Sequence, residues 1–310
     1  MYHFIINPKS RSGRGLRIWN EVKKILEEQN ITYQYHFTHY KNHATELAHL
    51  ISSQDNEIKN IVVLGGDGTV NEVINGIDDF SKVILGYIPS GSSNDFARSL
   101  GISNKPKEAL QTILSPKHFE YVDIGTLEMF QDNSKVAKRK FAVSSGIGWD
   151  ASVCYEALHS SIKKSLNKIG LGKLTYLIIA IKQIIAMKPS KGTILVDGSK
   201  KLSYQKVFFI ANMIHKYEGG GLSMAPKANS HDQKLSVCLL HDVSKLKVFI
   251  MLPTIIFGKH VFIKGVETFE CSTIDITLED AMHTHTDGEF TGTNRHIALN
   301  CLNNQLRIIT

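Results

Sequence analysis

The first third of the chain alternates short apolar runs with segments whose apolar residues recur at helical spacing. The apolar runs predict strands and the periodic segments predict helices. Strands that alternate with helices are typical of a mainly parallel sheet with helices packed on its faces. The predicted strands span residues 3–6, 31–37, 60–64 and 83–88, and the predicted helices span residues 16–29, 44–52, 70–77 and 94–100.

The pattern changes past Val122, where short β-like runs become dominant. We therefore predict two domains: an α/β domain over residues 1–125, joined by a returning tail over 297–310, and a β-sandwich-like domain over 126–296. The polar stretch at 131–135 predicts a hairpin loop. The β-like runs span residues 141–144, 192–196, 206–211, 235–240 and 272–278.

Two longer apolar stretches, residues 174–187 and 248–257, are too short to cross a membrane, which requires about 20 largely apolar residues. The first is interrupted by Lys182 and Gln183, and the second contains Pro253. Both predict helices that either face a core or contact lipid at a membrane interface. The lysines around the first stretch, which suit an interfacial helix, are Lys163, Lys164, Lys168, Lys173, Lys182, Lys188 and Lys191.

The formal net charge of +7 suits an anionic partner such as a membrane surface or a phosphorylated substrate. We expect no nucleic-acid partner, because the basic residues are dispersed and no recognition motif occurs. The four cysteines lie far apart without a CxxC pair, which argues against a zinc site or a disulfide framework. The chain begins with a predicted strand rather than a signal peptide, so we expect a cytoplasmic protein.

A glycine-rich loop, Gly-Gly-Asp-Gly-Thr at residues 65–69, follows an apolar strand and opens a predicted helix. Backbone amides at such a helix start can bind phosphate, and a carboxylate such as Asp67 can hold Mg²⁺. The loop is equally typical of a tight turn in which Asp67 accepts hydrogen bonds from backbone amides. Taken alone, the motif leaves both interpretations open.

Two further loops follow strands of the same predicted sheet: Asn-Pro-Lys-Ser-Arg-Ser-Gly-Arg-Gly at 7–15 and Pro-Ser-Gly-Ser-Ser-Asn-Asp at 89–95. Both are rich in small and hydroxyl residues and lie where open α/β sheets bind ligands. Neither matches a Walker P-loop or a GxGxxG dinucleotide motif, and protein-kinase signatures do not occur. The order of the three loops is therefore more informative than any one of them.

In that order the loops resemble the diacylglycerol kinase catalytic-domain family, in its bacterial lipid-kinase branch. Gly-Gly-Asp-Gly also occurs in NAD kinases and sphingosine kinases, to which the chain is distantly similar. The resemblance implies an NAD-kinase-like α/β nucleotide-binding domain followed by a β-sandwich-like domain, with the active site in the cleft between them. It continues through Val-Asp-Ile-Gly at 122–125, Gly-Ile-Gly at 146–148, three glycines at 219–221, Pro226 to Asp232, and Asp287-Gly288-Glu289.

The resemblance also implies residue roles. Asp67 would organise a catalytic Mg²⁺ through a network with Asp95, Asp123 and Arg14, and Glu289 would be the general base. Without the resemblance, Glu289 is an ordinary acid after a hairpin turn. The residues implied to contact ATP are Asn7, Pro8, Lys9, Ser10, Arg11, Thr38, Gly66, Asp67, Gly68, Thr69, Val70, Asn71, Glu72, Ser92 and Asp95.

A second, structural magnesium is implied at Asp232, with backbone carbonyls from the positions of Asn229 and Lys234. Here Gln233 replaces the glycine usual in the family, so the sequence leaves open whether this metal site persists. Ser92 stands where threonine is commoner and keeps the hydroxyl. The pair His283 and His285 lacks an evident third metal ligand, and we expect solvent-facing or packing histidines.

We expect an ATP-dependent lipid kinase that phosphorylates a lipid alcohol such as diacylglycerol, giving phosphatidic acid, and that works as a peripheral protein on the anionic inner face of the membrane. Phosphoryl transfer needs mainly alignment and charge neutralisation, which a glycine loop, a magnesium-binding carboxylate and a base can provide. A nucleotide kinase like the NAD kinases and a non-catalytic nucleotide- or lipid-binding module are the alternatives. The sequence does not identify the physiological lipid, and it does not show whether the chain forms a homodimer.

Overall fold

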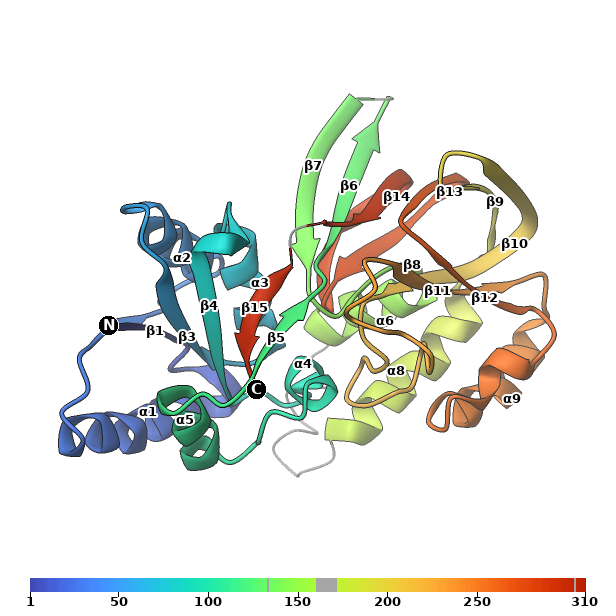
Figure 1. Cartoon of the computed structure of the whole chain (residues 1–310). Coiled ribbons are helices and arrows are strands. Elements are labelled where there is room, and N and C mark those ends of the chain that lie inside the picture. Colours follow the sequence, from blue (N-terminus) through green and yellow to red (C-terminus); the bar gives the residue numbers. More distant parts are fainter. Residues whose placement is uncertain (133, 160–171, 304) are drawn as a thin grey trace.

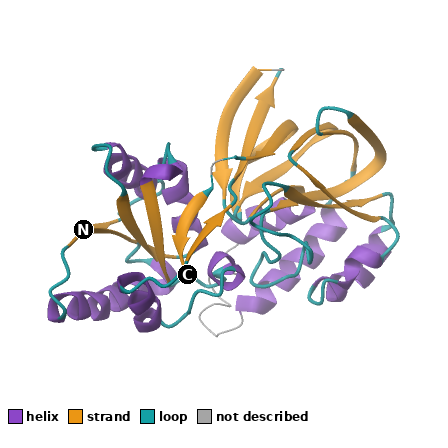
Figure 2. Ribbon diagram, viewed as in Figure 1, coloured by secondary structure: helices purple, strands orange, loops and turns teal. Residues whose placement is uncertain are grey.

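The computed structural model describes residues 1–132, 134–159, 172–303 and 305–310, without the side chains of residues 172–176. Its first part is a six-stranded sheet with helices on both faces (Figures 1 and 2). The strands are β1 (Tyr2–Ile6), β2 (Tyr33–Phe37), β3 (Lys59–Gly65), β4 (Val83–Pro89), β5 (Phe119–Val122) and β15 (Leu306–Ile309). The helices are α1 (Ser10–Glu28), α2 (His43–Ser53), α3 (Asp67–Gly76), η1 (Phe80–Lys82), α4 (Asp95–Ser99) and α5 (Pro106–Leu114).

The strand order of this sheet is β2-β1-β3-β4-β15-β5. The first five strands are parallel to their neighbours, whereas β5 runs antiparallel to β15. The carboxyl ends of β1, β3 and β4 therefore lie at one edge of the sheet, which is where an open α/β sheet binds ligands. The three loops singled out in the sequence begin at these ends.

Side chains of β1 alternate between two apolar cores, as a strand buried on both faces requires. Phe4 and Ile6 pack with Trp19 of α1 and with α5, and Ile5 packs on the opposite face with α2 and α3. Trp19 is 2% exposed and fixes the angle of α1 against the sheet. The two cores hold the loop-bearing edge rigid.

The second part is a nine-stranded antiparallel sheet with helices against it. The two longest strands, β10 and β13, each pair with both β8 and β9, so the four strands close a ring that curves the sheet. The strands are β6 (Gly125–Gln131), β7 (Ser134–Phe141), β8 (Ser144–Gly148), β9 (Ser190–Val196), β10 (Lys200–Met213), β11 (Leu235–His241), β12 (Val266–Cys271), β13 (Thr273–Thr286) and β14 (Glu289–Cys301). The helices are α6 (Trp149–His159), α8 (Gly172–Ala186), α9 (Lys245–Ile255) and η2 (Lys259–Phe262).

The prediction of an α/β part followed by a β-rich part is confirmed, but several boundaries differ. The predicted strand at 141–144 is wrong, because Phe141 ends β7, Ser144 begins β8, and the two residues between them form the turn. The predicted loop at 131–135 is shorter, since only residues 132–133 separate β6 from β7, and residue 133 is not described. The predicted tail at 297–310 is divided: β14 keeps residues 297–301 in the second sheet, and β15 joins the first.

The two apolar stretches form α8 and α9, which lie against each other. Among the described residues, no helix combines the length and apolarity that a membrane crossing requires. Of the lysines proposed to flank the first stretch, Lys163, Lys164 and Lys168 lie outside the described residues, as does the side chain of Lys173.

Candidate active site

The three loops meet through direct hydrogen bonds at the edge of the first sheet. The Asn7 amide nitrogen Nδ2 donates to Thr69 Oγ1 at 3.2 Å and joins the first loop to the glycine-rich loop. The hydroxyls of Ser10 and Ser90 lie 2.6 Å apart and join the first loop to the third. The three segments, distant in sequence, therefore form one surface.

Glycine at positions 66 and 91 is required because two backbones touch there. A Cβ on Gly91 would lie 2.6 Å from the Cα of Gly66, and a Cβ on Gly66 would lie 3.1 Å from the Cα of Gly91. Any larger side chain would push the second and third loops apart. The approach leaves the amides at the start of α3 next to the third loop, an arrangement that suits phosphate groups.

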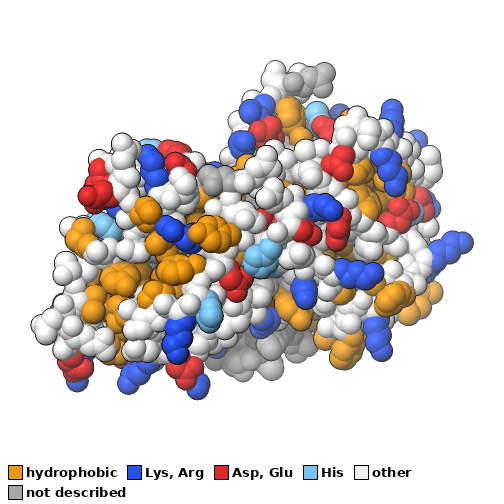
Figure 3. Space-filling view, in the orientation of Figure 1, with side chains coloured by type: hydrophobic (Ala, Val, Ile, Leu, Met, Phe, Trp, Pro, Cys, Tyr) orange, Lys and Arg blue, Asp and Glu red, His pale blue; other side chains and the backbone are white. Residues whose placement is uncertain are grey.

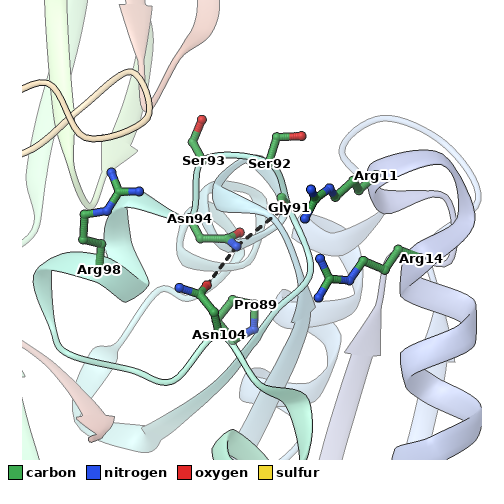
Figure 4. Close-up of a pocket in the computed structure, with 9 residues that line it drawn as sticks. All are labelled: Arg11, Arg14, Pro89, Gly91, Ser92, Ser93, Asn94, Arg98 and Asn104. Carbon is green, nitrogen blue, oxygen red and sulfur yellow. Dashed lines mark hydrogen bonds between the residues drawn. The ribbon is translucent and has the colours of Figure 1, made fainter. Parts of the chain in front are cut away.

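A basic pocket of about 200 Å³ opens beside the third loop (Figure 4). Arg11 and Arg14 point into it from the start of α1, and Arg98 approaches from the other side. Arg11 and Ser12 have positive φ angles of 44° and 58°, so a left-handed turn precedes the regular part of α1 and directs Arg11 to the pocket. Guanidinium groups converging on a small polar pocket match the chemistry of phosphate binding.

Asp67, the first residue of α3, binds the third loop rather than its own helix. Its Oδ2 accepts a hydrogen bond from the Asp95 backbone N–H at 3.1 Å, and its Oδ1 lies 3.4 Å from the Phe96 nitrogen. Burial and the neighbouring charge of Asp95 raise the pKa of Asp67 to about 7. Asp67 is therefore only partly ionised at neutral pH unless a cation compensates its charge.

Asp95 connects the first domain to the second. Its Oδ2 accepts from the Gly220 backbone N–H at 2.7 Å, and its Oδ1 lies 3.0 Å from Arg98 Nη1. Burial raises the pKa of Asp95 as well, against the opposing effect of these donors. Two partly buried carboxyl groups, those of Asp67 and Asp95, thus lie next to each other at the domain boundary.

The turn Asp287-Gly288-Glu289 joins β13 to β14 and reaches the glycine-rich loop from the second domain. The Asp287 carboxylate accepts from the backbone N–H groups of Ala142, Val143 and Ser144 at 2.8–3.0 Å. It also accepts from Asn71 Nδ2 at 2.8 Å. Asp287 therefore anchors the turn to both domains with four donors.

Glu289 is left free to face the glycine-rich loop. A Cβ added to Gly68 would lie only 3.2 Å from Glu289 Oε1. The Glu289 side chain is 30% exposed, and its Oε2 lies 3.7 Å from Lys41 Nζ. Glu289 of the second domain therefore lies beside the residue that directly follows Asp67.

His285 also contacts the turn at residues 287–289. Its Nδ1 accepts from the Gly288 backbone N–H at 3.2 Å, and its Nε2 lies 3.2 Å from Asp150 Oδ2 of α6. Burial acts to lower the pKa of His285, but Asp150 and the nearby Glu218 outweigh it and raise the pKa. His283 packs instead, with its ring 4.6 Å from Tyr155 and 5.2 Å from Phe290.

Several residues implied to contact ATP have other contacts. Val70 is 1% exposed in the core of the first domain. Asn71 binds Arg139 and Asp287, and the Glu72 carboxylate accepts from the backbone N–H groups of Asn42, just before α2, and Ala44 within it. Thr38 directly follows β2 and donates its backbone N–H to the Ile6 carbonyl at 2.8 Å. The residues that the structure brings together at the loop surface are Asn7, Pro8, Lys9, Ser10, Arg11, Gly66, Asp67, Gly68, Thr69, Ser92 and Asp95.

Asp123 lies with the loop proposed for the second metal. Its carboxylate accepts from the Gln233 backbone N–H at 2.7 Å and from Gln305 Nε2 at 2.6 Å. Gln233 adopts a left-handed φ of 58°, the conformation for which glycine is the usual residue. The neighbouring Asp232 Oδ1 accepts from the Lys234 backbone N–H at 3.1 Å, and Asn229 Oδ1 from the His231 N–H at 3.2 Å.

Sequence reasoning missed three polar residues of this region. Lys41 belongs to no motif, and only the fold brings it to Glu289. Arg98 follows Asp95 by one helical turn, a spacing that could have suggested the ion pair. The contact of Asp150 with His285 carries no local sequence signal, because the two residues lie 135 positions apart.

Comparisons with known proteins agree with this architecture. Residues 1–127 match the diacylglycerol kinase catalytic domain, and residues 144–310 match the YegS C-terminal NAD kinase beta sandwich-like domain. The candidate lipid kinase YtlR of Bacillus subtilis is 30% identical over 295 residues, which cover 94% of each chain. A diacylglycerol kinase of the same organism is 25% identical over 291 residues, which cover 93% of this chain and 89% of the relative.

Among solved structures, a candidate diacylglycerol kinase from Bacillus anthracis strain Sterne shares the fold. Its TM-score is 0.74 at 22% identity, and the alignment covers 99% of this chain and 94% of the other. The NAD-kinase-like fold expected from the sequence is confirmed by these matches. The chain therefore belongs to the diacylglycerol kinase family of lipid kinases.

Proposed function

We propose that this lipid kinase transfers the γ-phosphoryl group of ATP to the free hydroxyl of diacylglycerol, giving phosphatidic acid and ADP. The observation that carries the proposal is the position of Glu289, whose carboxylate faces the glycine-rich loop at Gly68, one residue from Asp67. The Bacillus subtilis relative that is 25% identical to this chain is named a diacylglycerol kinase, which supports diacylglycerol as the lipid.

The nucleotide would occupy the surface formed by the three loops. The amides at the start of α3 and the guanidinium groups of Arg11, Arg14 and Arg98 offer donors to the phosphate chain. Ser92 offers a hydroxyl at the same pocket. Val70, Asn71 and Glu72 would act by packing and by holding α3, α2 and the Asp287 turn in place, because their side chains have the partners described above.

The acidic residues beside this surface fit a divalent cation. The negative charges of Asp67 and Asp95 repel each other, which disfavours ionisation of Asp67. A bound cation would compensate this repulsion. We assign Mg²⁺ to this position, held by Asp67 directly or through water. When bound, it would neutralise charge that develops on the phosphates.

Glu289 would act as the general base. The lipid hydroxyl oxygen forms a bond to the γ-phosphorus while the bond to the bridging oxygen of ADP breaks, and the hydroxyl proton passes to Glu289. Lys41 Nζ lies 3.7 Å from Oε2 of Glu289, so the side chain of Glu289 has a cation beside the oxygen that does not face Gly68. Asp287 and His285 would fix the direction of the Glu289 backbone.

We keep the structural magnesium at Asp232, with Asn229 and Lys234, as part of the proposal. Gln233 supports it, because this residue keeps the left-handed turn that glycine would adopt and donates its N–H to Asp123.

The ATP-binding domain would span residues 1–125 with the returning strand, and the lipid domain would follow. A peripheral position on the cytoplasmic face of an anionic membrane fits the net charge of +7.

Two assays separate the proposal from its alternatives. Purified protein with Mg²⁺ and ATP should phosphorylate diacylglycerol in anionic vesicles and leave NAD unmodified. Turnover of NAD alone would establish the nucleotide-kinase alternative. ATP binding without turnover of either compound would establish a non-catalytic module.

A further inference from the structure

Nine large apolar side chains stand exposed on α8, α9 and the residues that follow α9. Phe262 is 84% exposed, Phe257 75%, Leu246 70% and Ile250 67%. Figure 3 shows hydrophobic side chains over α9 at the lower right, with basic side chains beside them. We call this set the apolar ridge: Leu177, Ile178, Ile181, Ile185, Leu246, Ile250, Ile256, Phe257 and Phe262.

The core does not account for the ridge, because the same helices already bury a second apolar face. Ile184 of α8 and Val248, Met251 and Ile255 of α9 belong to the core of the second domain, and Ile179 of α8 is buried as well. A helix with one face in a core normally turns a polar face to water. Exposed apolar side chains gathered on two helices that contact each other are typical of an interaction site.

The charge around the ridge indicates what covers it. Residues 172–191 and 245–264 each contain four lysines and no aspartate or glutamate. Lys188 and Lys259 are exposed, and within the described part of the chain neither forms an ion pair, whereas Lys182 pairs with Glu156 at 2.7 Å and Lys191 with Glu279 at 3.4 Å. Exposed apolar side chains on segments whose charged residues are all lysines are complementary to a bilayer with anionic headgroups.

A second copy of the chain fits the ridge less well. A two-fold contact would place the ridge of one protomer against that of the other and bring their lysine rims together. Like charges that face each other across an interface oppose association. No acidic residue in these two segments is present to pair with them.

The ridge is also connected to the catalytic turn. Trp149 of α6 donates its indole N–H to the Ala180 carbonyl of α8 at 3.1 Å, and the next residue, Asp150, holds His285 beside Gly288. We propose that the apolar ridge inserts into the anionic surface of a bilayer and holds the lipid domain on the membrane that carries its substrate. This inference rests on the proposed function for its purpose, but the docking itself can be measured without catalysis.

The test compares two triple variants in sedimentation with sucrose-loaded vesicles of phosphatidylglycerol and phosphatidylcholine. Ile250→Ser/Phe257→Ser/Phe262→Ser should weaken partitioning at least about tenfold, because it removes exposed apolar surface and leaves every lysine. Leu50→Ser/Ile58→Ser/Val136→Ser, at sites that are 53–57% exposed away from the ridge, is the matched control and should bind like wild type. Equal binding by both variants would overturn the proposal.

Two further measurements distinguish the possible failures. Both variants should keep wild-type activity on dioctanoylglycerol below its critical micelle concentration; loss of that activity only in the ridge variant would assign the ridge to the active site and overturn docking. If wild type binds vesicles through the ridge but phosphorylates no diacylglycerol, docking holds and the proposed function fails. Light scattering that shows a wild-type dimer and a monomeric ridge variant, with vesicle binding unchanged, would assign the ridge to self-association.

Discussion

Asp287 and Glu289 are two acids of one turn with opposite surroundings. Asp287 accepts four hydrogen bonds and has no free acceptor to offer a substrate. Glu289 has Lys41 beside one oxygen and faces the glycine-rich loop with the other. From this difference we infer that Asp287 holds the turn in place and that Glu289 takes part in the reaction.

Replacement of Glu289 by glutamine should lower kcat at least about 100-fold, because the amide keeps the shape of the side chain but cannot take the proton. Affinity for a non-hydrolysable ATP analogue should stay within about twofold of wild type. Steady-state kinetics on vesicles and calorimetric binding measure the two halves. Glu279→Gln, an exposed acid of the same domain, is the control. A variant that keeps its kcat would refute the base assignment.

The raised pKa of Asp67 predicts a pH dependence of stability. The pKa of Asp67 is about 7 in the folded state, above its ordinary value of 3.8. At a pH between these two pKa values, the folded state binds more protons than the unfolded state. The free energy of unfolding therefore falls as the pH rises from the lower pKa value to the higher. Asp67→Asn removes this loss. In metal-free buffer, its Tm relative to wild type should rise from about pH 5 to about pH 8.

Magnesium provides the second half of the Asp67 measurement. Added MgCl₂ should raise the Tm of wild type at about pH 8 by more than that of Asp67→Asn, because a ligand that binds only the folded state stabilises it and the variant retains only the site proposed at Asp232. An equal shift in both proteins would show that Asp67 holds no cation.

Among the elements, the second and third loops depend on a backbone contact. Gly91→Ala would force its Cβ against the Cα of Gly66, and overpacking of this kind costs about 1–3 kcal/mol of stability. Because the loops would separate, ATP-analogue affinity should also fall. Gly101→Ala is the control, since a Cβ there meets nothing within 4 Å and adds only the strain of a positive φ. Denaturant unfolding and calorimetry report both effects, and unchanged nucleotide affinity in Gly91→Ala would contradict the shared surface.

The sequence predicted the elements that have a strong local pattern. The apolar runs of β1, β3 and β4 placed the three loops at one edge, and the glycines marked where the loops approach. The roles inferred for Val70, Asn71 and Glu72 followed the motif along α3, but a helix turns successive residues in different directions, and these face a core or a neighbouring element. Lys41 and Asp150 could not be predicted, because only tertiary packing brings them to the site.

At the scale of the whole molecule, the first domain depends on the last strand of the chain. β15 lies between β4 and β5 in the first sheet, with Leu306 and Ile308 fully buried. Ending the chain after Gln305 removes this strand and leaves two strand edges unpaired, although every catalytic motif remains.

The first domain of the truncated chain should fail to fold. Burial of each large apolar side chain contributes about 1.5–3 kcal/mol, and a domain is stable by only about 5–15 kcal/mol in total. Circular dichroism should show less secondary structure than in the full chain, and denaturant unfolding should show no transition from the first domain. Removal of Thr310 alone, which lies beyond β15, should change little. Cooperative unfolding and ATP binding by the chain ending at Gln305 would contradict this view.

The position of β15 also has a consequence during synthesis. A ribosome produces β1 to β5 first, yet the sheet to which they belong stays open until residue 309 has been translated. The second domain, made between them, can close its ring of β8, β9, β10 and β13 earlier. The nascent chain would therefore complete its second domain before its first, and the sheet edge that carries the three loops would stay incomplete until translation is nearly over.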